Sequence, residues 1–408
     1  MLHSKVSFSF VAPLLITITL FCLLVVGLVA HRVDASSIFS QDAPRANPAF
    51  STATTSEFTP THWVYLPLTA RGQAAPTFGY GVQVNTAGDA SANIGHIRTL
   101  GFDWMKIQVR WKDIEPNQGD FRWDRLDPVV SAYHAGGVKV LLSVVHAPDW
   151  ARPPNDNRSV EGPPADYATL ANFLRELCQR YKGQVLAVEV WNEQNLFYEG
   201  GGRPIPPANY VAMLSASYQA IKLVDPNILV ISGAPTPTGI NDGNIAIDDV
   251  VYLQQMYAAG LKGKCDAIGA HPPGYNNPPD AQLGYTDPAE PCCKSHRAFF
   301  FRETLEAYRN VMVSNGDAAG KIWATEFGWA SATNPEPGYE YAQNNTLDEQ
   351  AQYTVRAYQM AKAWGWVGAM FLWNLDFGVT NPNTVLAYWS LLRPDPVPAY
   401  AALVAMPK

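Results

Sequence analysis

The stretch Val188-Glu189-Val190-Trp191-Asn192-Glu193-Gln194-Asn195 joins a short apolar run directly to a polar cluster. With Leu186 and Ala187, its first half is rich in valine and too short for a helix, which is typical of a buried β-strand. Glu193 stands at the end of this strand, where burial and neighbouring charges can raise the pKa of a carboxyl group. Such a group can donate a proton near neutral pH, although a glutamate bonded to loop backbone would give the same pattern.

A second stretch, Lys321-Ile322-Trp323-Ala324-Thr325-Glu326-Phe327-Gly328-Trp329, repeats this design with one glutamate at the end of an apolar run. Two strand-end carboxylates can act as the proton donor and the nucleophile of glycoside hydrolysis. The neighbouring indoles offer flat apolar faces for sugar rings. The sequence therefore indicates a carbohydrate-active site, provided that the fold brings Glu193 and Glu326 together.

Short apolar runs of this kind recur along the chain and alternate with longer stretches at helical spacing. The predicted strands are Phe78–Val84, Trp104–Val109, Val138–Val145, Val185–Trp191, Ile228–Ser232, Ala267–Ala270, Ile322–Thr325 and Val367–Trp373. The predicted helices are Asp89–Leu100, Asp124–Ala135, Ala165–Tyr181, Ala208–Val224, Asp248–Ala259, Ser295–Val313 and Leu347–Trp364. This alternation predicts an α/β fold, the parallel (β/α)8 TIM barrel.

A doubly wound open sheet is the alternative, but Gln83-Val84-Asn85 follows the first strand in place of a glycine-rich phosphate loop. In a barrel all strands point their carboxyl ends at one face, where the active site is built. Glu193 and Glu326 would then face each other across the mouth of the barrel. We expect their carboxyl groups to lie about 5 Å apart, the separation typical of retaining hydrolysis.

The composition favours a large exported domain. The chain has 408 residues, 47 % of them hydrophobic, and a net charge of −7, which argues against nucleic acid as a partner. Residues 6–30 carry no charge, so we expect residues 1–35 to be a signal peptide or an N-terminal membrane anchor. Residues 36–76 resemble a Ser/Thr/Pro-rich linker, within which 63–68 could dock as a short strand. Residues 77–408 would form the catalytic domain, secreted or anchored on the outer face of the cell membrane.

Export permits disulfides. We expect Cys178 to be a buried free thiol and Cys265 to pair with Cys292 or Cys293, with fully reduced cysteines as the alternative. His296 lies close to the adjacent cysteines, but neighbouring cysteines chelate metals poorly.

Several of these motifs resemble the clan A retaining glycoside hydrolases. The segment Arg110–Pro116 resembles their second barrel segment, Trp191-Asn192-Glu193 their acid/base motif and Thr325–Gly328 their nucleophile motif. His271-Pro272 and Trp373 are similar to their motifs on strands six and eight. The order of motifs is similar both to the β-xylosidase and α-iduronidase type and to the cellulase and mannanase type. The loop 274–294 departs from the common pattern and leaves the substrate open.

By this resemblance Glu193 would be the general acid/base and Glu326 the nucleophile. Arg110 would keep Glu326 ionised, unless it pairs with Asp113 or Glu115. Asn192 would donate to a sugar 2-hydroxyl group.

Aromatic residues and histidines would complete the subsites. His146 and His271 would bind sugar or orient a carboxylate, and Trp373 would form the floor of the sugar subsite. Tyr275 and Trp329 would be platforms for outer sugars.

These expectations describe a monomeric retaining glycosidase that cleaves β-linked polysaccharides or oligosaccharides without metal or cofactor. A barrel that binds carbohydrate without cleaving it is the alternative. A metal-dependent barrel hydrolase is disfavoured, because the strand ends carry no His-x-His pair or clustered acids.

Overall fold

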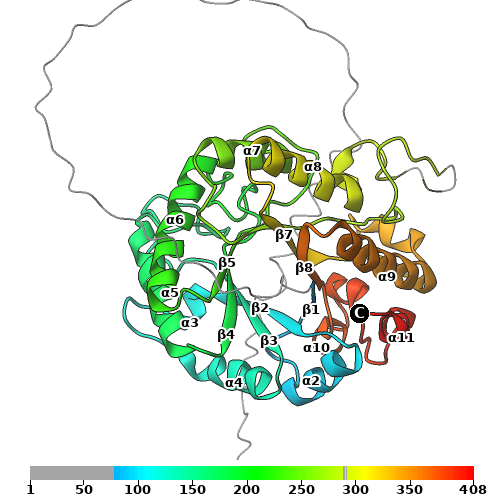
Figure 1. Cartoon of the computed structure of the whole chain (residues 1–408), viewed down its shortest axis with the longest axis horizontal. Coiled ribbons are helices and arrows are strands. Elements are labelled where there is room, and N and C mark those ends of the chain that lie inside the picture. The colour runs from blue at the N-terminus through cyan, green and yellow to red at the C-terminus, as the bar shows by residue number, and fades with distance from the viewer. Residues whose placement is uncertain (1–77, 288–289, 291) are drawn as a thin grey trace, which may run out of the picture.

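Eight parallel strands close into one barrel, with helices arranged around it (Figure 1). The structure is a computed structural model, and it describes residues 78–287, 290 and 292–408. The strands are β1 (Gly79–Gln83), β2 (Trp104–Arg110), β3 (Lys139–Val145), β4 (Val185–Val190), β5 (Leu229–Ser232), β6 (Ala267–Ala270), β7 (Lys321–Phe327) and β8 (Val367–Leu372). Because β1 pairs with both β2 and β8, the described sheet is a closed ring. The predicted TIM barrel is confirmed.

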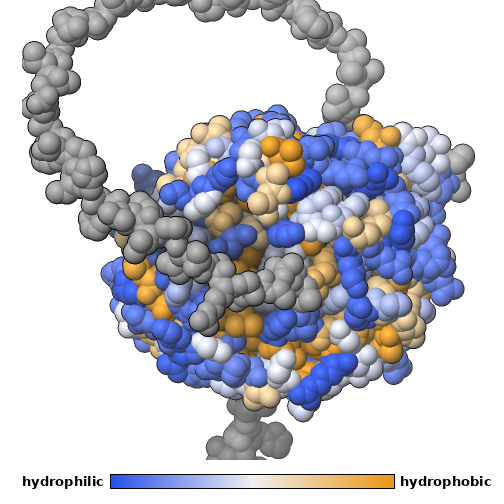
Figure 2. All heavy atoms as spheres, viewed as in Figure 1, coloured by the Kyte–Doolittle hydropathy of each residue, from blue (hydrophilic) through white to orange (hydrophobic). Residues whose placement is uncertain are grey.

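The helices follow the strands in the predicted order. They are α2 (Ala90–Thr99), α3 (Trp111–Ile114), α4 (Asp127–Ala135), α5 (Tyr167–Arg180), α6 (Pro207–Val224), α7 (Asp249–Ala258), α8 (Phe301–Ser314), α9 (Leu347–Trp364), α10 (Phe377–Thr380) and α11 (Pro398–Ala405). The helix predicted from Ser295 begins at Phe301, because a 3-10 turn at Arg297–Phe299 precedes it. In the same view, hydrophilic residues cover much of the described surface over the helices (Figure 2).

Strand β2 shows how the sequence sorts side chains between the two sides of the barrel wall. Met105, Ile107 and Val109 belong to the core cluster that packs against the helices. The alternate residues point inward because successive side chains of a strand face opposite sides. Trp104, the first of these, packs with its ring centroid 5.2 Å from that of Trp323.

Aromatic and small side chains fill the barrel at the amino ends of its strands. Phe371 places its ring centroid 6.0 Å from Trp323 and 6.2 Å from Trp104. A Cβ at Gly81 would lie 2.4 Å from the Phe371 ring, so only glycine leaves room for it. We call Trp104, Trp323 and Phe371 the aromatic floor.

One cysteine expectation is wrong. The structure joins Cys292 to Cys293, whereas Cys265 and Cys178 are free thiols. Cys265 packs against the core cluster, and burial raises the pKa of its thiol. Because Cys292 and Cys293 bond to each other, no disulfide links their loop to Cys265.

The predicted export segment, the linker and the possible strand at 63–68 lie outside the described residues. None of the helices in the described part of the chain has the length and apolar character of a membrane span.

Candidate active site

Two adjoining cavities open at the carboxyl end of the barrel strands, and both are lined by Glu193, Glu326 and Trp373. We call the first the apolar cavity, which is also lined by Thr236, Pro237, Thr238, His271, Pro272, Pro273, Gly274, Tyr275, Phe327, Gly328, Tyr341 and Trp389. We call the second the polar cavity, which is also lined by Gln83, Val84, Asn85, Thr86, Gln108, Arg110, His146, Asn192, Glu199, Phe377, Asn381 and Leu386. The two glutamates selected from the sequence therefore meet where the two cavities join.

Glu326 lies near the end of β7, where the pairing register with β8 shifts between Ala324 and Phe327. Such an irregularity re-aims a side chain. Its Oε1 accepts a hydrogen bond from Lys106 Nζ at 2.9 Å. The cation that contacts this carboxylate is thus Lys106 of β2.

Lys106 is fully buried and lies between two glutamates. Its Nζ is 3.2 Å from Oε2 of Glu189, and it also donates to the backbone oxygen of Thr325 at 3.2 Å. Glu189 in turn accepts a hydrogen bond of 2.6 Å from Thr325 Oγ1. Glu189 is therefore a buried residue that is paired with Lys106 and Thr325.

The charge of Lys106 follows from these neighbours. Burial alone lowers the pKa of its ammonium group, but the negative charges of Glu189 and Glu326 and its hydrogen bonds to them outweigh that effect and raise the pKa. Lys106 is therefore a permanent cation under Glu326.

Glu193 lies in the turn after β4 with a φ of 41°, and its backbone N–H donates to the Ala234 oxygen at 3.0 Å. Its Oε1 is 3.1 Å from Nδ1 of His271, which follows β6. Burial lowers the pKa of His271, but the charge of Glu326 and the hydrogen bond to Glu193 outweigh burial and raise it. The two glutamates thus have different partners, a lysine for one and a titratable imidazole for the other.

Tyr275 and Trp373, which the sequence suggested as an outer sugar platform and the floor of a sugar subsite, both line the apolar cavity. The Tyr275 ring lies 4.8 Å from that of Tyr341 and 5.1 Å from that of Phe299. Trp373 packs edge-on to Trp389 at 5.2 Å. These contacts fix the aromatic wall before any ligand binds.

Trp329 does not lie on this wall, which corrects the expectation of an outer platform. It is 1 % exposed, and its Nε1 donates to the Asn277 oxygen at 2.8 Å. Gly274 lies directly over the indole, since a Cβ there would be 2.1 Å from it. Trp329 supports the wall from beneath and offers no face to a sugar.

Arg110, His146 and Asn192 line the polar cavity. Arg110 pairs with Asp113 at 3.2 Å and donates to His146 Nδ1 at 3.3 Å, so the predicted alternative partner is the one observed. Burial lowers the pKa of His146 to about 3, against the charge of Glu161. His146 is therefore a neutral hydrogen-bonding group at neutral pH.

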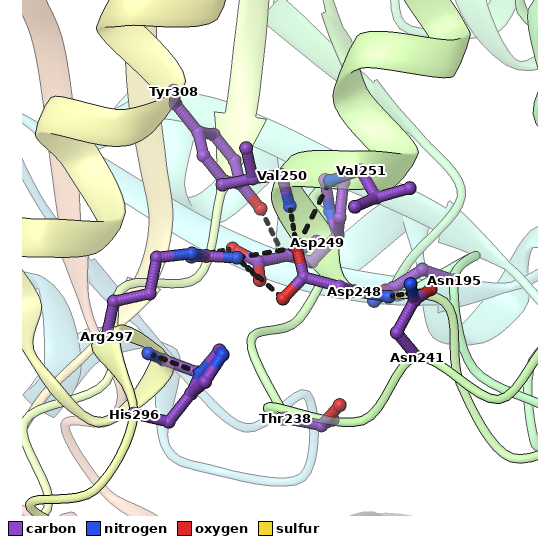
Figure 3. A network of polar contacts seen from close by, with 12 residues as sticks. Asn195, Thr238, Asn241, Asp248, Asp249, Val250, Val251, His296, Arg297 and Tyr308 are labelled. Carbon is purple, nitrogen blue, oxygen red and sulfur yellow. Dashed lines mark hydrogen bonds and ion pairs between the residues drawn. The ribbon is translucent and has the colours of Figure 1, made fainter. Parts of the chain in front are cut away.

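A separate ionic network fixes the loops that form the outer wall of the apolar cavity (Figure 3). Arg297 donates to Asp248 at 2.6 Å and to Asp249 at 2.7 Å, joining the 3-10 turn before α8 to the start of α7. The backbone N–H of Thr236 donates to Oδ1 of Asn195, in the turn after β4, at 2.8 Å. Thr236 lines the cavity, so this wall is anchored on both sides.

Sequence reasoning missed Lys106 and Glu199. The alternation Trp104-x-Lys106-x-Gln108-x-Arg110 placed three polar residues on the inward face of β2, and this was the available signal. No comparable periodic signal marked Glu199, which follows β4 in an irregular loop.

Within the described part of the chain, no group of three or more His, Cys, Asp or Glu side chains has the arrangement of a metal site. Of the carboxylates that line the two cavities, Glu326 is bonded to Lys106 and Glu193 to His271.

Comparison with known proteins bears on this arrangement. A family model described as cellulase (glycosyl hydrolase family 5) matches residues 68–369. A family 39 glycoside hydrolase from Bacteroides cellulosilyticus WH2 is similar in structure, with a TM-score of 0.62 at 23 % identity, covering 81 % of this chain. This chain spans 64 % of that protein's length.

Two further solved structures share the fold. An endo-beta-1,4-glucanase from Xanthomonas axonopodis pv. citri has a TM-score of 0.52 at 13 % identity, covering 80 % of this chain and 98 % of its own. An exo-beta-1,4-mannosidase from Opitutaceae bacterium strain TAV5 has a TM-score of 0.53 at 16 % identity, covering 81 % of this chain and 59 % of its own.

Proposed function

Because the chain belongs to glycosyl hydrolase family 5, the cellulase family of clan A, it is a glycosidase, and we propose that it hydrolyses β-glycosidic bonds with retention of configuration. In this proposal Glu326 is the nucleophile and Glu193 the general acid/base. The substrate is a β-linked plant or microbial polysaccharide or oligosaccharide.

One observation carries the assignment of roles. The two carboxyl groups line the same cavities but have different partners, Lys106 for Glu326 and His271 for Glu193. A permanent cation favours the ionised carboxylate that a nucleophile requires. A titratable imidazole suits a group that must give up a proton in the first step and regain one in the second.

The reaction then runs in two displacements. Glu193 protonates the leaving oxygen while Glu326 attacks the anomeric carbon and forms a glycosyl-enzyme. Glu193 then takes a proton from water, which attacks the same carbon and releases the sugar with its original configuration.

The localisation is part of the proposal. The uncharged run at 6–30 supports export, so that the domain acts outside the cell, as a monomer, either free or held at the membrane surface. A polysaccharide substrate is compatible with a location outside the cell.

Release of reducing sugar from a panel of β-linked polysaccharides tests the activity, with Glu326→Gln as the matched variant. We expect release by the wild type and a loss of at least about 10³-fold in the variant. Proton NMR of the first product should show the β-anomer. Equal release by both proteins, or an α-anomer first, would overturn the proposal.

Substitution of the second glutamate separates the two roles. Glu193→Ala should lose polysaccharide hydrolysis but still react with aryl glycosides whose leaving groups need no proton, and azide should then yield a β-glycosyl azide. Full activity of Glu193→Ala on polysaccharide would show that another group supplies the proton.

A further inference from the structure

The wall of the polar cavity contains three buried oxygens that accept no hydrogen bond in the described structure. They are Oε1 of Gln83, Oδ1 of Asn192 and Oε2 of Glu199, on side chains that each line this cavity. Their residues are 3 %, 7 % and 3 % exposed, respectively. Buried polar atoms of folded proteins nearly always have a partner, so these oxygens are suited to accept hydrogen bonds from a ligand that carries hydroxyl groups.

Glu199 is the acidic member of this group, and its position is fixed independently of any ligand. Its backbone oxygen accepts a hydrogen bond of 3.1 Å from Trp191 Nε1. Its Oε1 is 3.5 Å from Asn192 Nδ2, and its Oε2 is 3.7 Å from His146 Nε2, which is beyond a hydrogen bond. The free oxygen of Glu199 thus belongs to a rigid wall beside Glu193.

We propose that Glu199 binds a ring hydroxyl of the sugar next to the scissile bond through this free oxygen, and that it makes the polar cavity selective for neutral sugars over uronic acids. This inference rests on the proposed glycosidase function and extends it to the class of sugar.

The surroundings of Glu199 support both the binding of a ring hydroxyl and the selectivity for neutral sugars. Burial, and then the charges of Glu193 and Glu161, raise the pKa of Glu199 well above its ordinary value, against weaker effects of Asn192 and Lys112. His146 is neutral and supplies no opposite charge. A protonated carboxyl group can donate a hydrogen bond to a sugar oxygen as well as accept one.

A uronic acid meets a less favourable environment in this cavity. The nearby cations are already engaged, since Lys112 pairs with Glu161 and Arg110 with Asp113. A sugar carboxylate would add a negative charge beside the ionised Glu326, and like charges at close range are costly in a buried site.

The test uses Glu199→Gln and Glu199→Leu with a neutral aryl β-glycoside and its monodeoxy analogues. The amide keeps a donor and an acceptor, so kcat/KM should fall less in Glu199→Gln than in Glu199→Leu, which should lose at least about tenfold. When the hydroxyl that contacts Glu199 is missing from the substrate, kcat/KM of the wild type should fall by the same factor. The kcat/KM of Glu199→Leu should not fall further with that substrate. Such non-additivity identifies a direct contact.

A structural role for Glu199 gives a different pattern. Removal of each hydroxyl would then lower kcat/KM by the same factor in both enzymes, and that result would overturn the inference. If Glu199→Leu does not fold, as judged from its thermal transition, Glu199→Ala takes its place in the same comparison, and equal losses in both enzymes at every deoxy position would again overturn the inference.

A separate experiment tests the selectivity against uronic acids. The wild type should cleave a neutral aryl β-glycoside at least about tenfold faster than the corresponding aryl uronide, and equal rates would contradict the selectivity. Absence of turnover on every glycoside would instead refute the proposed function, so the two failures are distinguishable.

Discussion

Lys106 places a positive charge inside the barrel, where burial opposes it and two glutamates retain it. Side chains of this kind are costly unless they are paired. Here the pairing serves Glu189 on one side and Glu326, which lines both cavities, on the other. We regard Lys106 as a positioning residue that acts through Glu326.

Replacement of Lys106 by methionine should lower kcat/KM by about 10²-fold or more, because Glu326 loses the cation that stabilises its ionised form. Lys139→Met is the control, since this lysine pairs with Asp103 on the exposed side of the barrel.

Stability separates this role from a structural one. Lys106→Met also leaves Glu189 buried without its cation, which should cost about 3–5 kcal/mol of unfolding free energy. Adding Glu189→Gln should recover much of that stability but not the rate. Recovery of both would show that Lys106 only supports the fold.

The alkaline limb belongs to the coupled pair of Glu193 and His271. Glu326 and Glu193 raise the pKa of His271, so the imidazolium persists to higher pH than usual and its charge favours ionised Glu193. His271→Asn removes this charge and should move the alkaline limb to higher pH. Glu193→Gln should abolish that limb for activated substrates. A limb unchanged in Glu193→Gln would assign the proton to His271.

At this scale the sequence predicted the residues that end strands but not their partners. Glu193, Glu326, His271 and Trp373 were found because an apolar run ends at each of them. Lys106 was missed because a lysine within a strand is usually at the surface, and only the closed barrel brings it under Glu326.

Among the elements, the strands were predictable and the loops were not. Each strand's bounds lie within a few residues of the prediction, because an apolar run between turn residues is a local signal. The buried position of Trp329 depends instead on how the loops after β6 and β7 pack against each other, since its indole donates to the Asn277 oxygen. No local pattern encodes that arrangement.

The link between α7 and α8 should carry much of the stability of these loops. Arg297→Ala leaves Asp249 fully buried without its cation, so we expect a loss of about 3–5 kcal/mol in chemical denaturation. Arg356→Ala is the matched control, because Arg356 and Asp280 are both half-exposed and such pairs contribute about 0–1 kcal/mol. Equal losses in the two variants would show that the network of Figure 3 has no special weight.

For the whole molecule, the barrel closes within residues 79–372, since β1 pairs with β8. A chain that begins at Thr77 should therefore fold, with the melting temperature and kcat/KM of the full-length protein. Thermal unfolding and hydrolysis of an aryl β-glycoside, measured side by side, check this. A large fall in either would show that the preceding residues complete the fold.

The aromatic floor fills the barrel at the end opposite the two cavities, with Trp104, Trp323 and Phe371 packed against one another. Above it the side chain of Lys106 is fully buried, whereas that of Glu326 is partly exposed. A sugar bound in the cavities would cover the side of Glu326 that faces solvent. Hydrogen exchange at the Lys106 ammonium group should therefore slow while a sugar is bound.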